Sequence, residues 1–225
     1  MYLFVKVVAV NIGVRTPIVY NGKNEETGIY KYSSKAPIFL AKSGVKDDHV
    51  VDRRYHGGID KACYAYGLGG YAFWKKQYPE KEMLPGMFGE NLTIEGLDET
   101  NLFIGQLFKV GGALIQVSQP RIPCYKLGIR FIDMSMVKQF QMADFPGAYF
   151  RVLEEGFVKM GDELVLQDQK DIGNITVAQV FSLFRGGTLN VHLIEKALQE
   201  PFLSESIKTN IRGFLASRKK SPNHS

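Results

Sequence analysis

Residues 107–118 read LFKVGGALIQVS, two short apolar runs joined by a pair of glycines. Runs of this length that contain β-branched and aromatic residues are typical of strands. Two consecutive glycines between such runs supply the backbone freedom that a tight hairpin turn requires. The stretch therefore predicts a β-hairpin, with one strand at Leu107–Val110 and the other at Ala113–Ser118.

Similar strand signals recur on both sides of this hairpin. Leu3–Val10 reads as a strand, and Tyr149–Leu153, Phe157–Lys159 and Glu163–Leu166 read as three more, separated by turns that contain glycine. Many short strands broken by glycine turns are typical of a barrel or a sandwich, and the chain contains 23 glycines. Residues 1–168 are therefore predicted to form one mainly β domain.

Two short helices are also predicted within this domain. One spans residues 70–78 and ends at Pro79, because proline cannot continue a helix. The other begins at Asp133, a favourable N-cap residue, and runs to Phe140 with apolar residues at helical spacing. The domain is thus expected to combine strands with short helices.

The C-terminal part of the chain shows the pattern of three amphipathic helices. Thr176, Asn190 and Ser204 each precede apolar residues at helical spacing, and a glutamine three residues after Thr176 completes the form of a capping box. Residues 172–218 are therefore predicted to form a small three-helix domain. It is too small to be very stable alone, so it is expected to pack on the β domain or on another subunit. Residues 219–225 are predicted to be a flexible basic tail.

Composition limits the classes of function. The 225 residues carry a formal net charge of +5, which favours small anionic ligands. Neither a basic stripe with interleaved aromatics nor a recognition helix is evident, so nucleic-acid binding is not expected. No apolar run approaches the roughly 20 residues that span a bilayer, and the first residues lack the pattern of a secretory signal. The expected location is the cytoplasm, with no membrane contact.

Cys124 lies in the run QPRIPCYKL, residues 119–127, between two prolines, an arginine and a lysine. Neighbouring cations favour the thiolate, which is the form that attacks electrophiles and binds soft metals. This local context leaves a functional thiol and an inert one as open alternatives. The second cysteine, Cys63, lies among small and aromatic residues and is expected to be a buried core residue. A disulfide between the two is not expected in a reducing compartment.

A second candidate segment, residues 52–58, reads DRRYHGG. Paired glycines let backbone N–H groups approach an anion closely, and arginine offers bidentate recognition of phosphate or carboxylate. The alternative is a solvated charged loop. If this segment meets residues 121–126, the two form a pocket with a reactive sulfur, an imidazole and several anion-binding groups. Spacing along the chain does not decide whether they meet.

Three blocks in this order, His56-Gly57-Gly58, Phe88–Leu92 and Gln119–Leu127, resemble the signature blocks of MOSC-domain proteins. That family is named after the C-terminal domain of molybdenum-cofactor sulfurase. With the three predicted helices included, the chain is similar to the stand-alone bacterial subgroup linked to resistance against N-hydroxylated purine analogues. The resemblance covers nearly all of the chain. It implies a MOSC-type β-barrel followed by a small three-helix domain.

The resemblance also implies the chemistry of the site. It implies a bound molybdenum cofactor (Mo-pterin), with Cys124 as a catalytic residue and molybdenum ligand and with His56 as a catalytic proton relay. The implied reaction is the reductive dehydroxylation of N-hydroxylated compounds. Its electrons are expected from a separate reductase, because no nucleotide or flavin fingerprint is present. The residues expected to bind the cofactor are Lys31, Asp52, Arg53, Arg54, Gly57, Gly58, Asn91, Arg121 and Lys126.

Two other functions remain open. One is a non-redox carrier of the cofactor or of sulfur on Cys124, and the other is a cofactor-free enzyme in which His56 activates Cys124. The chain also departs from the family pattern, because Asp47 stands before Asp48 where members usually have glycine. Asp tolerates a left-handed backbone at some cost, so this turn is expected to survive. A homodimer is a further expectation.

Overall fold

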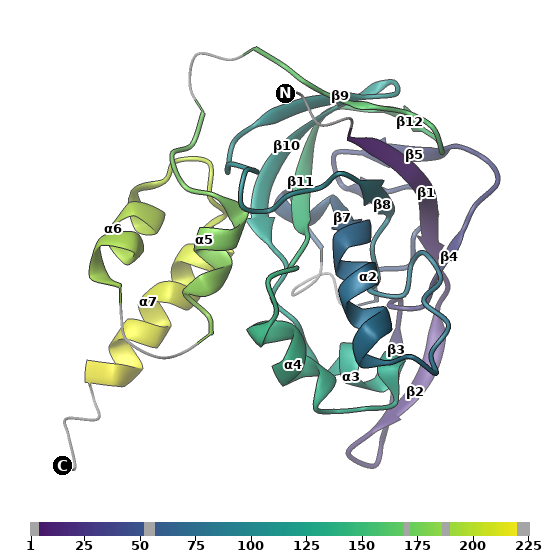
Figure 1. Ribbon diagram of the computed structural model, residues 1–225, viewed down its shortest axis with the longest axis horizontal. Coiled ribbons are helices and arrows are strands. Elements are labelled where there is room, and N and C mark those ends of the chain that lie inside the picture. Colours follow the sequence, from purple (N-terminus) through teal and green to yellow (C-terminus); the bar gives the residue numbers. More distant parts are fainter. Residues whose placement is uncertain (1–4, 52–56, 169–171, 186–189, 220–225) are drawn as a thin grey trace.

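The computed structural model of the chain describes residues 5–51, 57–168, 172–185 and 190–219 (Figure 1). Its largest element is a curved sheet of eight strands. The order of the strands across this sheet is β13 (Leu164–Leu166), β9 (Leu107–Val110), β10 (Ala113–Pro120), β11 (Ala148–Glu154), β7 (Cys63–Gly67), β8 (Leu92–Glu95), β1 (Lys6–Gly13) and β4 (Lys31–Ser33).

Strand pairing in the main sheet is antiparallel except between β7 and β8, which are parallel. The predicted hairpin is confirmed, since β9 and β10 pair with Val110 opposite Ala113. Gly111 in its turn has a φ of 52°, and a Cβ there would lie 2.5 Å from the carbonyl oxygen of Phe157. Glycine is therefore required at this turn. The remaining strands form a three-stranded sheet, of β12 (Gly156–Val158), β5 (Ile38–Ala41) and β6 (Gly44–Val45), and a hairpin of β2 (Thr16–Tyr20) and β3 (Lys23–Thr27).

The mainly β architecture is confirmed, but the main sheet is not closed into a barrel. Its edge strands are β13 and β4, and a single bridge, Lys6 opposite Glu163, links β1 back to the start of β13. Three backbone hydrogen bonds accompany this bridge. They run from the N–H of Val7 to the carbonyl oxygen of Asp162 at 2.9 Å, from Gly161 to Val7 at 2.8 Å and from Leu164 to Val5 at 2.8 Å. The ladder goes no further because β13 is only three residues long. The predicted barrel is thus corrected to a curved, open sheet.

Four short helical segments lie within the β region: η1 (Ile59–Lys61), α2 (Leu68–Gln77), α3 (Tyr125–Phe131) and α4 (Met136–Met142). The helix predicted over residues 70–78 is α2, which begins two residues earlier. The helix predicted from Asp133 is α4, and it begins later because Asp133 caps the preceding turn instead. Oδ1 of Asp133 accepts hydrogen bonds from the backbone N–H of Ser135 at 2.9 Å and from the hydroxyl of Ser135 at 2.6 Å.

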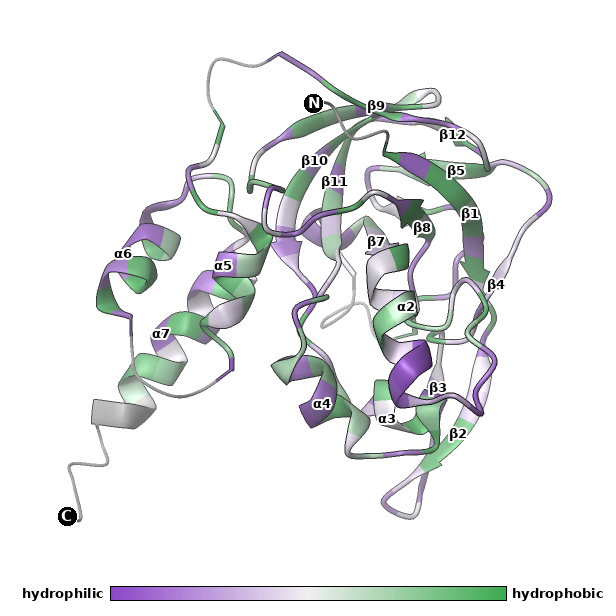
Figure 2. Cartoon of the chain, viewed as in Figure 1, coloured by the Kyte–Doolittle hydropathy of each residue, from purple (hydrophilic) through white to green (hydrophobic). Residues whose placement is uncertain are grey.

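The three C-terminal helices are α5 (Val177–Ser182), α6 (Val191–Gln199) and α7 (Glu205–Lys219). Their predicted caps are present, because Thr176 and Gln179 form the capping box and Asn190 accepts a hydrogen bond from the N–H of Leu193. Figure 2 shows hydrophobic and hydrophilic residues alternating along these helices. They pack on the sheet, since Val177, Val180 and Ile207 belong to the same buried cluster as residues of β10. The boundaries of a separate helical domain stay a prediction.

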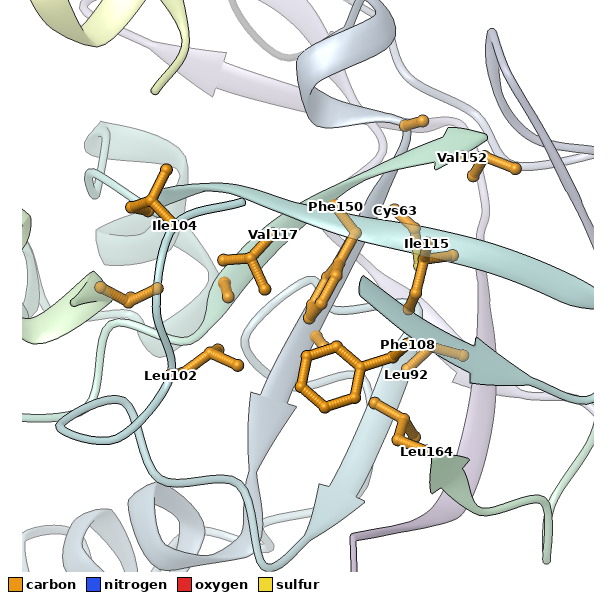
Figure 3. Close-up of a cluster of buried hydrophobic side chains, with 14 of the residues drawn as sticks. Cys63, Leu92, Leu102, Ile104, Phe108, Ile115, Val117, Phe150, Val152 and Leu164 are labelled. Atoms are coloured by element: carbon orange, nitrogen blue, oxygen red, sulfur yellow. The ribbon is translucent and has the colours of Figure 1, made fainter. Parts of the chain in front are cut away.

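Two hydrophobic clusters support the sheet. The first lies among its strands and is drawn in part in Figure 3; it includes Cys63, Leu92, Phe108, Ile115 and Phe150. The second is aromatic and joins α2, α3 and α4 to the sheet; it includes Tyr66, Trp74, Phe88, Phe131 and Phe140. Aromatic pairs of this kind give cores both burial and directional packing. None of the described helices has the length and apolar composition needed to cross a lipid bilayer.

Candidate functional site

Cys124 lies at the junction between strand β10 and helix α3. The strand ends at Pro120, and Cys124 is the N-cap residue of α3, with extended backbone at φ −128° and ψ 171°. The prolines around it keep the chain out of the helix until Tyr125. Its side chain is half-buried and lines a cavity. The sulfur is therefore held at a defined position from which it reaches this cavity.

One cavity brings the two candidate segments together. Gly57, and Lys61 in the helical turn that follows it, line the same cavity as Cys124. The sequence alone did not decide whether residues 52–58 and 121–126 lie together. Of the residues predicted to bind the cofactor, those that line this cavity are Lys31, Gly57, Asn91, Arg121 and Lys126.

The other predicted residues are not in the described part of this cavity. Gly58 is exposed, has a φ of 95° and serves as the residue before η1 instead of lining the cavity. Asp52, Arg53, Arg54 and His56 lie outside the described residues. Their roles stay predictions.

Lys31 is held in a buried ion pair. Its Nζ contacts Oδ2 of Asp48, and the two side chains are only 7% and 3% exposed. Asp48 also accepts hydrogen bonds from the N–H of Gly13 at 2.6 Å and from Nδ2 of Asn91 at 3.1 Å. Buried charges are tolerated when they are paired and hydrogen-bonded in this way. Lys31, Asp48 and Asn91 therefore form a rigid part of the cavity wall in which the charge of Lys31 is already balanced.

The turn before Asp48 has the left-handed backbone that glycine adopts most easily. Asp47 has a φ of 64°, in the left-handed region. Asp reaches this region more easily than most residues, because its short side chain interferes little with the backbone. The expectation that the turn survives is confirmed. Close by, Gly28 packs against the backbone of His49 so tightly that a Cβ there would overlap the carbonyl group.

Arg121 is one of the buried cations of the cavity. The residue is 6% exposed, and its guanidinium lies 5.3 Å from the ring centroids of both Tyr64 and Phe140. Its Nη1 has no hydrogen-bond partner among the described residues. Burial lowers the pKa of Arg121, but Tyr64, Tyr149 and Cys124 together raise it more, so the pKa lies above its ordinary value. A buried guanidinium with an unmade hydrogen bond indicates a place for an anion.

Several side chains of the cavity were missed by sequence reasoning: Lys61, Tyr64 and Tyr149. Burial lowers the pKa of Lys61 and raises the pKa of Tyr149 to about 12. Both changes favour the neutral form of the side chain over the charged one. Strand alternation was a usable signal for Tyr64, because it faces away from its neighbour Cys63 in β7. His49, expected at the surface, is exposed and also lines the cavity.

Other expectations near the cavity are now decided. Cys63 is fully buried, and burial raises the pKa of its thiol to about 12, so it is an inert core residue as expected. The sequence left open whether Glu90 and Asn91 line the pocket or close a turn. Asn91 lines the cavity, whereas Glu90 is fully buried and accepts hydrogen bonds from the N–H of Gly86 at 2.8 Å and the hydroxyl of Thr93 at 2.7 Å.

The donor set around Cys124 is also informative. Within the described part of the chain, no three His, Cys, Asp or Glu side chains lie close enough together to hold a metal ion.

Comparison with known proteins gives the family. The model of the MOSC domain matches residues 52–165, which is more than half of the chain. The chain belongs to the MOSC family. The matched region of this MOSC protein contains both candidate segments, residues 52–58 and 119–127, and ends within β13. Helices α5, α6 and α7 lie beyond it.

Relatives extend the similarity to most of the MOSC protein. It is 39% identical to YflK of Bacillus subtilis over 89% of this chain and 90% of that protein, and 32% identical to YiiM of Escherichia coli over 76% and 79%. The crystal structure of YiiM from Geobacillus stearothermophilus has a TM-score of 0.76 and 29% identity, covering 94% of this chain and 99% of that one. A protein of Gibberella moniliformis named "Reductase" is 30% identical over 78% of this chain, but only 31% of its own length is matched.

Proposed function

We propose that this MOSC protein binds a molybdenum–pterin cofactor in the cavity beside Cys124 and reduces N-hydroxylated compounds there. The proposal rests on one observation above all. The guanidinium of Arg121 is buried with an unpartnered Nη1 among the described residues, and it shares a cavity with a half-buried thiol. The first group favours an anion and the second a soft metal. A cofactor that carries both phosphate and molybdenum meets both requirements.

The residues of the chain fit such a group. Arg121 and Lys126 would bind its anionic part, and the backbone N–H groups near Gly57 would assist. Asp52, Arg53 and Arg54 are proposed to complete this side of the site. Lys31 is proposed to act by holding the wall in place, since Asp48 already balances its charge.

Cys124 would supply one sulfur ligand to molybdenum. The described residues offer no cluster of further metal ligands, so the sulfur atoms of the pterin would provide the rest. This division suits a metal that arrives within an organic cofactor.

When bound, the molybdenum centre supplies the two electrons that cleavage of an N–O bond requires. The overall reaction converts N–OH, two electrons and two protons into N–H and water. We assign the delivery of protons to the chain itself. Burial lowers the pKa of Lys61, which makes its ammonium a better proton donor towards the cavity that it lines. His56 is the proposed second donor.

The electrons would come from a separate reductase, which is a proposed partner of this protein. The name of the fungal relative, "Reductase", supports an oxidoreductase. The matched part is 31% of that protein, so its name describes a longer chain.

The test compares molybdenum content and reduction of an N-hydroxylated purine base in the wild type, Cys124→Ser and Cys63→Ala. All are produced in a host that makes the pterin cofactor, and each is assayed with a chemical reductant. The proposal expects molybdenum and turnover in the wild type and in Cys63→Ala, and loss of both in Cys124→Ser. Molybdenum bound by the wild type without turnover would favour the carrier. A wild type without molybdenum would contradict the cofactor assignment and favour the Cys–His enzyme.

A further inference from the structure

A second cavity adjoins the first one at Cys124. The two share four lining residues, Lys61, Cys124, Lys126 and Tyr149. The second cavity differs in its other wall, which is contributed by Ser206, Ile207 and Asn210 of helix α7. The C-terminal helices therefore reach the site that Cys124 lines.

Helix α7 is firmly held in this place. The hydroxyl of Ser204 donates a 2.6 Å hydrogen bond to Oε1 of Gln119, and the hydroxyl of Ser206 donates to the same oxygen at 3.3 Å. Gln119 belongs to β10 and precedes Arg121 by two residues. Ile207, beside these serines, is buried in the cluster that the helices share with the sheet. The start of α7 is thus fixed to the strand that carries the reactive loop.

The second cavity has aromatic and apolar surfaces in addition to its cationic side chains. Two tyrosine rings, Tyr125 and Tyr149, and the side chain of Ile122 give it flat and apolar surfaces. Asn210 adds a carboxamide that can donate and accept hydrogen bonds. None of the described residues that line it is acidic, whereas two lysines are present. Such a lining suits a planar neutral molecule with hydrogen-bond acceptors and disfavours a cation.

We propose that the substrate binds in this second cavity, between Cys124 and helix α7, and that Asn210 hydrogen-bonds to it. The cofactor occupies the first cavity, and the shared residues lie where the two meet. The substrate class is a neutral, planar, N-hydroxylated heteroaromatic base. This inference rests on the proposed function and assigns its substrate site.

The experiment measures binding of 6-hydroxylaminopurine to the full-length, cofactor-loaded protein by titration calorimetry, together with molybdenum content. Asn210→Trp fills the cavity and Asn210→Ala removes only the carboxamide. Thr209→Trp is the matched control, because Thr209 is exposed on the same helix and does not line the cavity. Asn210 is exposed and differs from Thr209 in lining the cavity. The loss of a hydrogen bond and of space predicts a dissociation constant raised about tenfold or more in Asn210→Trp and severalfold in Asn210→Ala.

Thr209→Trp is expected to bind the purine as the wild type does, and molybdenum content is expected to stay constant in all variants. A protonated N-hydroxyguanidine is expected to bind about tenfold more weakly than the purine. Unchanged purine binding in Asn210→Trp would overturn the inference. So would loss of molybdenum in parallel with purine binding, or equal affinity for the cation.

Failure of the proposed function would look different. Asn210-dependent purine binding without turnover would reject the reductase and keep the site. Turnover of the purine with binding that ignores Asn210 would reject the site and keep the reductase.

Discussion

At residue 121 the protein buries a guanidinium and leaves one of its nitrogens without a partner among the described residues. An unsatisfied buried donor costs on the order of 1–3 kcal/mol, and more when it is charged. Contacts with the rings of Tyr64 and Phe140 offset part of this cost. A ligand that accepts the unmade hydrogen bond would offset the rest. The sequence predicted Arg121 as an anion binder, but its burial and its missing partner come from packing that no local pattern encodes.

Arg121→Met is expected to weaken cofactor binding without lowering the stability of the cofactor-free protein. Methionine keeps most of the apolar volume between the two rings and removes the buried charge. Molybdenum content should fall about tenfold or more, because a charge-assisted hydrogen bond contributes about 1.5–3 kcal/mol. Urea unfolding of the cofactor-free protein measures the effect on stability. The molybdenum content per protein molecule measures the effect on cofactor binding.

Arg130→Met is the control for this substitution. Arg130 also lies over a ring, 4.7 Å from the centroid of Tyr30, and its buried Nε lacks a partner among the described residues, but it does not line the cavity. The molybdenum content of the Arg130→Met variant should match that of the wild type. A cofactor content in Arg121→Met equal to that in Arg130→Met would remove Arg121 from the binding site.

At the scale of elements, local signals were the reliable ones. The hairpin at residues 107–118 and the cap at Thr176 depend on neighbouring residues, and both were predictable. Helix α3 was missed, since the prolines before it suggested only a loop. The parallel pairing of β7 with β8 was out of reach, because α2 and a long turn separate the two strands. Pairings of this kind depend on the whole fold.

The ion pair between Lys31 and Asp48 joins β4 to the turn after β6. Lys31→Met is expected to lower the free energy of unfolding by about 3–5 kcal/mol, because it leaves the carboxylate of Asp48 buried without its cation. Lys109→Met is the matched control, as Lys109 pairs with Glu154 in an exposed position, where such pairs contribute about 1 kcal/mol or less. Equal losses in both variants, measured by urea unfolding, would show that burial does not set the strength of the first pair.

At the scale of the whole molecule, the curved sheet and the C-terminal helices share one buried cluster. The sequence predicted both parts, and it left open whether the helices pack on the β domain or on another subunit; the shared cluster places them on the sheet of the same chain. The sequence did not predict the open edges, because closure depends on the lengths of strands such as β13 that only the folded chain defines. The homodimer and the reductase partner stay predictions at this scale.

Glu99 gives the molecule a dependence of stability on pH. Burial raises the pKa of its carboxyl from 4.5 to about 7, while its carboxylate accepts a hydrogen bond from the N–H of Gly147 at 3.0 Å. Above about pH 4.5 the unfolded chain loses this proton and the folded chain keeps it, so stability falls as pH rises. The loss is complete near pH 7 and amounts to about 1.4 kcal/mol per pH unit within this window.

Glu99→Gln is therefore expected to reduce the difference in unfolding free energy between pH 5 and pH 8. Glutamine keeps an oxygen for Gly147 and has no proton to lose. Asp98→Asn is the control, since the pKa of Asp98 is lowered and its titration lies below this window. The unfolding free energy of both variants is measured by urea unfolding at pH 5 and pH 8. If it falls as steeply in Glu99→Gln as in Asp98→Asn, Glu99 is not the source of the pH dependence.

The central claim is that Cys124 contacts molybdenum in the cavity that Arg121 lines. The most direct measurement is a selenium-edge X-ray absorption spectrum of the cofactor-loaded protein with the substitution Cys124→Sec. The account predicts a molybdenum atom in the first shell of the selenium at residue 124. A molybdenum-loaded protein whose selenium has only light-atom neighbours would contradict it.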